Sequence, residues 1–121
     1  RKARDIGASA IMVSNHGGRQ LEGAPAPVDC IPAMRDAIGN DLELIVDGGI
    51  RRGSHVIKAI ALGANACSIG RPYLYGLAAG GQQGVERALQ LLKEEIERNL
   101  TLLGCPSISE LNEQYLSRVP G

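Results

Sequence analysis

His16 and Arg19 are the two side chains whose types and spacing best fit acid–base chemistry on a small carboxylic acid. A histidine titrates near neutral pH, and a guanidinium pairs with a carboxylate through two parallel hydrogen bonds. Gly17 and Gly18 lie between them, where they let the backbone turn and a ligand approach closely. Either residue alone would more often be a loop histidine or a solvated charge. The combination predicts a site that handles a hydroxy acid or a keto acid.

Two further glycine-rich segments carry an arginine and predict a site for an anion. The first, DGGIR at 47–51, offers a carboxylate, two backbone amides without side chains and a guanidinium just before an expected helix. The second, GR at 70–71, is followed by Pro72, which favours the first turn of a helix. Backbone amides at helix N-termini and arginines bind phosphate, although each segment alone could be only a tight turn. The pair predicts a phosphate site built from Asp47, Gly48, Gly49, Ile50, Arg51, Gly70 and Arg71.

Short apolar runs alternate with amphipathic segments, which is typical of parallel β–α units in an α/β fold. The runs predict strands, buried on both faces, at 8–13, 42–46 and 64–69. Each strand ends at one of the three candidate segments. Helices are expected before Gly7, from a cap at Asp29 to Gly39, from a cap at Ser54 to Gly63, at 83–103 after a loop of small residues, and near 109–116.

The composition is that of one soluble globular unit, with 121 residues, 44% of them hydrophobic, and 13 basic against 13 acidic side chains. Zero net charge gives no support for nucleic-acid binding, and no segment has the roughly 20 apolar residues of a membrane span. Cys30, Cys67 and Cys105 are widely spaced, which indicates reduced thiols in a cytoplasmic protein and no metal site. Because the first residue is Arg1, we expect the chain to begin inside a longer protein.

Three motifs, SNHGGRQ at 14–20, DGGIRRG at 47–53 and GRPYLYG at 70–76, together resemble the FMN-dependent 2-hydroxy-acid oxidases and dehydrogenases. This family includes glycolate oxidase, lactate dehydrogenases and mandelate dehydrogenase. SNHGGRQ is the specific signal, because loops like DGGIRRG also occur in other flavin and nucleotide barrels. The resemblance covers essentially all 121 residues. It implies that 1–121 is the C-terminal part of one such domain, namely strands 6–8 and their helices of a (β/α)₈ TIM barrel.

The resemblance also implies a role for each motif residue. His16 would be the active-site base and contact the substrate, and Arg19 would bind the substrate carboxylate. Ser14 would hydrogen-bond the flavin ring system and Asp47 the ribityl hydroxyls. The FMN phosphate would lie among Gly48, Gly49, Ile50, Arg51, Gly70 and Arg71, whereas Arg52 would be structural and His55 and the cysteines would have no catalytic role. The implied reaction oxidises an L-2-hydroxy acid to the 2-keto acid and passes two electrons to FMN.

The family's lysine on strand 5, its aspartate on strand 4 and its substrate-binding tyrosines have no counterpart in this chain. We therefore expect this chain to be a fragment that is inactive alone. Its parent enzyme would be a homo-oligomer, and whether that enzyme associates with a membrane stays open. The substrate, the electron acceptor and the choice between hydride and carbanion routes also stay open. Two alternatives remain: a non-catalytic phosphate- or flavin-binding half-barrel, and a nucleotide-processing barrel of the inosine monophosphate dehydrogenase type, which would explain DGGIRRG but not His16 with Arg19.

Overall fold

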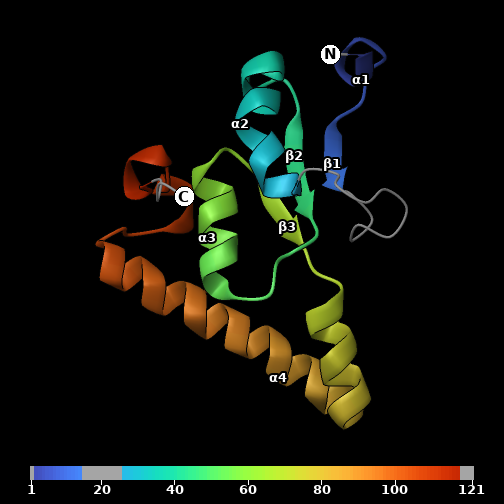
Figure 1. The fold of residues 1–121 in the computed structure, drawn as a ribbon, viewed down its shortest axis with the longest axis vertical. Helices are drawn as coiled ribbons and strands as arrows, with labels where there is room; N and C mark the ends of the chain where they lie inside the picture. The colour runs from blue at the N-terminus through green and yellow to red at the C-terminus, as the bar shows by residue number, and fades with distance from the viewer. Residues whose placement is uncertain (1, 15–25, 118–121) are drawn as a thin grey trace.

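The chain forms an α/β unit around a three-stranded parallel sheet, in a computed structural model that describes residues 2–14 and 26–117 (Figure 1). The strands are β1 (Ala10–Ser14), β2 (Glu43–Asp47) and β3 (Ala66–Ser68), in the order β1-β2-β3. The helices are α1 (Lys2–Asp5), α2 (Pro27–Ile38), α3 (Gly53–Ala61) and α4 (Arg71–Leu103), followed by the 3₁₀ turns η2 (Ile108–Glu110) and η3 (Glu113–Tyr115). The predicted parallel β–α units are confirmed.

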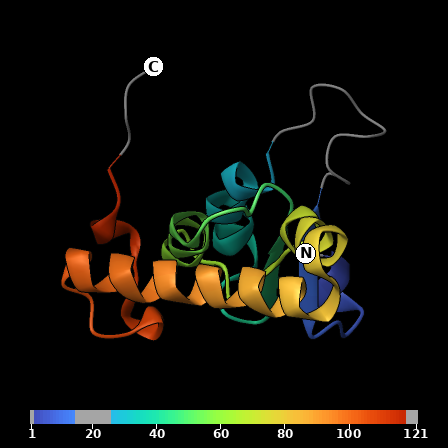
Figure 2. The same cartoon turned by 90° about the horizontal axis from the view of Figure 1, so that it is seen from below.

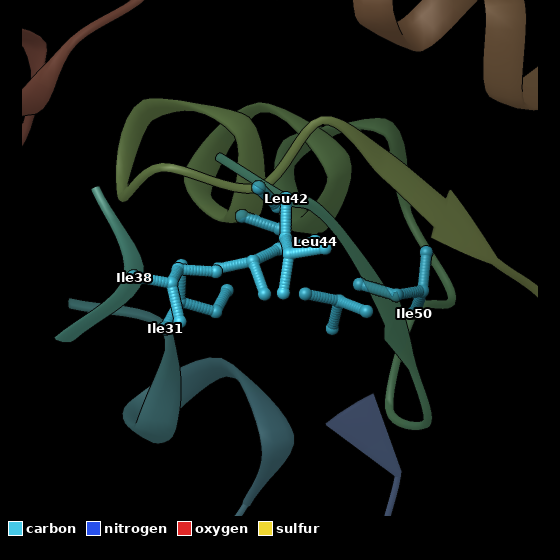
Figure 3. Close-up of a cluster of buried hydrophobic side chains, with 8 residues drawn as sticks. Ile31, Ile38, Leu42, Leu44 and Ile50 are labelled. Carbon is cyan, nitrogen blue, oxygen red and sulfur yellow. The ribbon is translucent and has the colours of Figure 1, made fainter. Parts of the chain in front are cut away.

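One face of the sheet is covered by α2, which packs on β1 and β2, and by α3, which packs on β3. Leu44 and Val46 of β2 are fully buried there, together with Ile31 of α2 (Figure 3). Burying such a side chain completely contributes about 1.5–3 kcal/mol, so these residues stabilise the packing of α2 on β2. The candidate segments begin at the carboxyl ends of the strands.

The opposite face of the sheet is not covered by any element within 2–14 and 26–117. Side chains alternate between the two faces of a strand, so Met12 and its partner Ile45 point away from α2 and α3. Met12 is 57% exposed. The expectation that the strands are buried on both faces is therefore wrong for the described part of the chain, because the helices that pack on the sheet there, α2 and α3, lie on one side.

The starts of two helices differ from the prediction. Helix α2 begins at Pro27 and not at a cap on Asp29, because the fixed φ of proline suits the first position of a helix. Helix α3 has Arg52 as its N-cap, so the predicted cap at Ser54 is wrong. Both helices end next to the predicted glycines.

Helix α4 consists of two arms, 71–79 and 82–103, joined at a kink. Gly80 and Gly81 have non-helical backbone angles, and Gly81 has a φ of 60°. The loop of small residues expected before residue 83 is therefore helical for most of its length. Figure 2 shows the longer arm, in orange, running across the molecule beside α3. The arms touch through glycines, because a Cβ on Gly84 would collide with the carbonyl oxygen of Gly76.

Gly84→Ala should destabilise the protein by about 1–3 kcal/mol, because the added methyl group forces the two arms apart. Thermal unfolding followed by circular dichroism measures this effect. Gly80→Ala is the matched control, since a Cβ there meets nothing within 4 Å and the change should stay within about 0.5 kcal/mol. Equal melting temperatures for the two variants would contradict the close contact of the arms.

The C-terminal tail folds back on α3 and α4. Cys105 and Leu111 are buried against Ile57 and Ala61 of α3. The single short helix expected near 109–116 is replaced by the two turns η2 and η3. Although α4 is long, no helix in the described ranges combines the length and hydrophobicity needed to span a bilayer.

Candidate functional site

Three polar side chains form a row at the carboxyl ends of the strands. Ser14 pairs with Asp47, and Asp47 pairs with Ser68, in the register of the parallel sheet. The Ser14 hydroxyl donates a hydrogen bond of 2.8 Å to Oδ2 of Asp47. This row lies on the sheet face that α2 and α3 do not cover, so it can meet a ligand at the strand ends.

The loop after β2 turns through Gly48 and Gly49, which have φ values of 112° and 75°. Other residues rarely adopt these angles, so the two glycines are required by the turn itself. The turn brings residues 48–51 to the edge of a cavity.

This cavity of about 150 Å³ joins the loop after β2 to the start of α4. Arg51 comes from the first of these elements and Arg71 from the second. The two predicted arginine segments are therefore neighbours in space. The lining residues are Asp47, Gly48, Gly49, Ile50, Arg51, Ser68, Gly70, Arg71 and Pro72.

The N-terminus of α3 is already occupied by other side chains of the protein. The amide of Gly53 donates to Oε2 of Glu95 at 2.7 Å. Nδ1 of His55 accepts from the amides of Arg51 and Arg52, at 3.1 and 3.2 Å. We expected this helix start to favour an anion, and within the described residues the carboxylate of Glu95 is the anion that its first amide binds. Of the two helix starts, that of α4 is the one that lines the cavity.

Arg52 has the structural role that we expected for it. Its Nε atom contacts both oxygens of Glu95, at 2.9 and 3.0 Å, so its guanidinium is paired with a carboxylate from α4. The two adjacent arginines therefore have different roles, since Arg51 lines the cavity and Arg52 joins two helices.

His16 and Arg19, the residues expected to perform the chemistry, lie outside the described residues, as do Gly17 and Gly18 between them. Their proposed roles therefore rest on the motif. Ser14, the first residue of that motif, is placed at the end of β1 and bonded to Asp47.

Sequence reasoning missed two residues that line the cavity, Ser68 and Pro72, and two that bond the backbone beside it, His55 and Glu95. Ser68 could have been found, because it is a polar residue at a strand end like Ser14. Pro72 was expected only as a helix-starting residue, but it also lines the cavity. Glu95 had no local signal, since it lies 42 residues after the amide that it accepts from.

The cysteine nearest to this region does not offer a reactive thiolate. Burial raises the pKa of the Cys67 thiol on β3 to about 11. The thiol therefore stays protonated at neutral pH and packs as a small apolar residue. Cys30, Cys67 and Cys105 are all free of disulfides.

A family model described as FMN-dependent dehydrogenase matches residues 1–118. The L-lactate oxidase of Nostoc sp. is 48% identical over 115 residues, which are 95% of this chain and 32% of that protein. Pre-mycofactocin synthase of Mycobacterium tuberculosis is 53% identical over 112 residues, 93% of this chain and 28% of that protein. A solved structure of a soluble mutant of the membrane-associated (S)-mandelate dehydrogenase from Pseudomonas putida matches with a TM-score of 0.91 and 44% identity, over 96% of this chain and 33% of that chain.

The chain spans about a third of the length of the curated relatives it matches. The matches confirm the resemblance predicted from the three motifs, and they confirm FMN as the cofactor named for the matching family. They also favour this family over the nucleotide-processing alternative, because the family match extends over nearly the whole chain.

Proposed function

Because this chain belongs to the family of FMN-dependent dehydrogenases, we propose that it is the C-terminal part of an enzyme that oxidises an L-2-hydroxy acid to the 2-keto acid. The observation that carries the proposal is the cavity that Arg51 and Arg71 both line. A phosphate-bearing cofactor needs such a site. The names of the L-lactate oxidase and (S)-mandelate dehydrogenase relatives support 2-hydroxy acids as the substrate class.

The residues around the cavity fit the phosphate end of FMN. Arg51, Arg71 and the glycine turn line a space bordered by the start of α4, and guanidiniums and backbone amides both bind phosphate. Arg51 and Arg71 would hold the phosphate, Asp47 would accept from the ribityl hydroxyls, and Ser14 would hydrogen-bond the ring system. When bound, FMN supplies the two-electron acceptor for the reaction.

The strands β1, β2 and β3 would be strands 6, 7 and 8 of a (β/α)₈ barrel. In such barrels a phosphate site frequently forms from the loops after strands 7 and 8 with the N-terminus of a short extra helix. The loops after β2 and β3 and the first arm of α4 match this arrangement. The uncovered sheet face, with Met12 and Ile45, would become part of the barrel interior.

The chemical step would depend on the motif that follows β1. Arg19 would hold the substrate carboxylate in a two-point contact, which also orients the hydroxyl-bearing carbon. His16 would remove a proton, either from the hydroxyl while hydride leaves the carbon or from the carbon itself. In both routes the substrate loses two protons and two electrons, and the electrons pass to the flavin.

Isolating the full-length protein and identifying its bound cofactor tests the proposal. Anaerobic mixing with lactate, glycolate and mandelate should then bleach the flavin absorbance with at least one of the three acids. A protein that binds no FMN would contradict the proposal, and so would an FMN protein that no 2-hydroxy acid reduces.

The chain is 53% identical to pre-mycofactocin synthase and 48% identical to the L-lactate oxidase, which supports a second candidate function. In this function the same cofactor site would serve the formation of pre-mycofactocin. The experiment above separates the two candidates. Bound FMN that resists every 2-hydroxy acid would favour the second, because the cofactor site would be intact and only the substrate class would differ.

Arg51→Ala and Arg71→Ala should each weaken FMN binding by about tenfold or more, because a hydrogen bond to a charged group contributes about 1.5–3 kcal/mol. Riboflavin, which lacks the phosphate, should bind the variants as it binds the wild type. Titration of the full-length apo-protein with both flavins measures the difference. Arg87→Ala is the control, since Arg87 lies on α4 outside the cavity lining. Wild-type FMN affinity in both variants would show that the phosphate binds elsewhere.

A further inference from the structure

Glu95 contacts the start of α3, directly after the loop that lines the candidate phosphate cavity. It belongs to the longer arm of α4, and its carboxylate accepts from the first amide of α3 and from the guanidinium of Arg52. The Glu95 side chain is only 22% exposed. The residue next to Arg52 is Arg51, which lines the cavity, so the contact lies one residue from the candidate anion site.

The backbones of α3 and α4 are in direct contact at this point. A Cβ on Gly53 would lie 2.5 Å from Cβ of Glu95 and 2.7 Å from the backbone nitrogen of Ile96. A side chain at residue 53 would therefore push α3 away from α4. The close approach holds the Gly53 amide against the Glu95 carboxylate.

The backbone of Arg51 and Arg52, which leads into α3, is also held by a side chain of α3 itself. His55 accepts from the amides of Arg51 and Arg52, so the backbone that carries both arginines is bonded to its own helix. The hydrogen bond from Arg52, and after it the bond from the Gly53 amide, lowers the pKa of Glu95. The carboxylate is therefore charged at neutral pH.

We propose that Glu95 is a positioning residue for the cofactor phosphate, and this inference rests on the function proposed above. Its carboxylate serves as an internal anion that occupies the start of α3 and neutralises Arg52. An incoming phosphate is thereby directed to Arg51, to Arg71 and to the start of α4. The same carboxylate ties the end of the loop after β2 to the longer arm of α4, which leads through the kink at Gly80 and Gly81 to the arm that begins at the cavity.

Glu95→Gln and Glu95→Ala in the full-length protein test this role. Glutamine keeps the size and an acceptor oxygen but cannot neutralise Arg52, whereas alanine removes both contacts. We expect FMN binding to weaken by about tenfold in Glu95→Ala and by less in Glu95→Gln, while riboflavin binding changes by less than about twofold. The selectivity for FMN over riboflavin is the decisive measurement, because a purely structural role would weaken both flavins equally.

Glu94→Gln is the matched control, because it removes the neighbouring negative charge on the same helix. In the described structure Glu94 contacts Gln90 and Arg87 of α4 itself, so this variant should keep wild-type affinity for both flavins. Melting temperatures of the apo-proteins show whether each variant folds, and Glu95→Gln carries the test if Glu95→Ala does not.

Unchanged selectivity for FMN over riboflavin in the Glu95 variants would overturn the inference, whether both affinities stay at the wild-type level or fall equally. A wild-type protein that binds riboflavin as tightly as FMN would instead overturn the phosphate site itself. The two failures are therefore distinguishable.

Discussion

His16→Ala in the full-length protein should leave FMN bound but slow the reduction of the flavin by substrate about 10²–10⁴-fold, the usual contribution of a general base. Every residue that we assign to the cofactor phosphate lies in the segments 47–51 and 70–71, so removing the histidine should not affect cofactor retention. Anaerobic stopped-flow mixing with the best 2-hydroxy acid measures the rate of bleaching at saturating FMN.

The other histidine of the chain provides the control. His55→Asn keeps an acceptor near the amides of Arg51 and Arg52, and it changes a residue that supports the loop without any expected contact to the substrate. Flavin reduction in this variant should stay within about threefold of the wild-type rate, well below the effect of a general base. Near-normal bleaching in His16→Ala would remove His16 from the mechanism.

The fold could be predicted where local sequence determines the structure. Three apolar runs, each too short for a helix and each followed by a glycine-rich turn, became three parallel strands. The start of α3 could not be predicted in the same way. Ser54 is a common capping type, but the Gly53 amide is bonded by Glu95, which reaches it from another helix. A cap supplied by a distant residue leaves no trace in the local pattern.

The candidate site could likewise be predicted only where it depends on local sequence. Residues 47–51 and 70–71 could be predicted to lie together, because the carboxyl ends of parallel strands meet at one edge of a sheet. Which of the two helix starts, that of α3 or that of α4, is left for an external anion could not be predicted. The start of α3 is bonded to Glu95, a carboxylate from a distant part of the chain. The kink between the two arms of α4 lies at Gly80 and Gly81, and small residues there were equally consistent with a loop.

The chain of 121 residues, expressed alone, should neither oxidise 2-hydroxy acids nor retain FMN. Within the described ranges β1 and β3 are edge strands, and unpaired edges favour pairing with other chains. The sheet face with Met12 is open, and Leu74, Tyr75 and Leu77 of α4 are at least 48% exposed. Apolar surface of this extent favours association, so we expect aggregates or paired copies.

Size-exclusion chromatography with detection at flavin wavelengths, after incubation with FMN, tests this prediction. The full-length protein is the control and should elute with its flavin. For the short chain we expect colourless material that elutes as aggregates or paired copies, because the cavity lined by Arg51 and Arg71 would engage only the phosphate end of the cofactor. A single phosphate contact region leaves the flavin ring in water, so its burial cannot contribute to affinity. A yellow monomer of 121 residues that oxidises lactate, glycolate or mandelate would contradict the expectation that the chain is inactive alone.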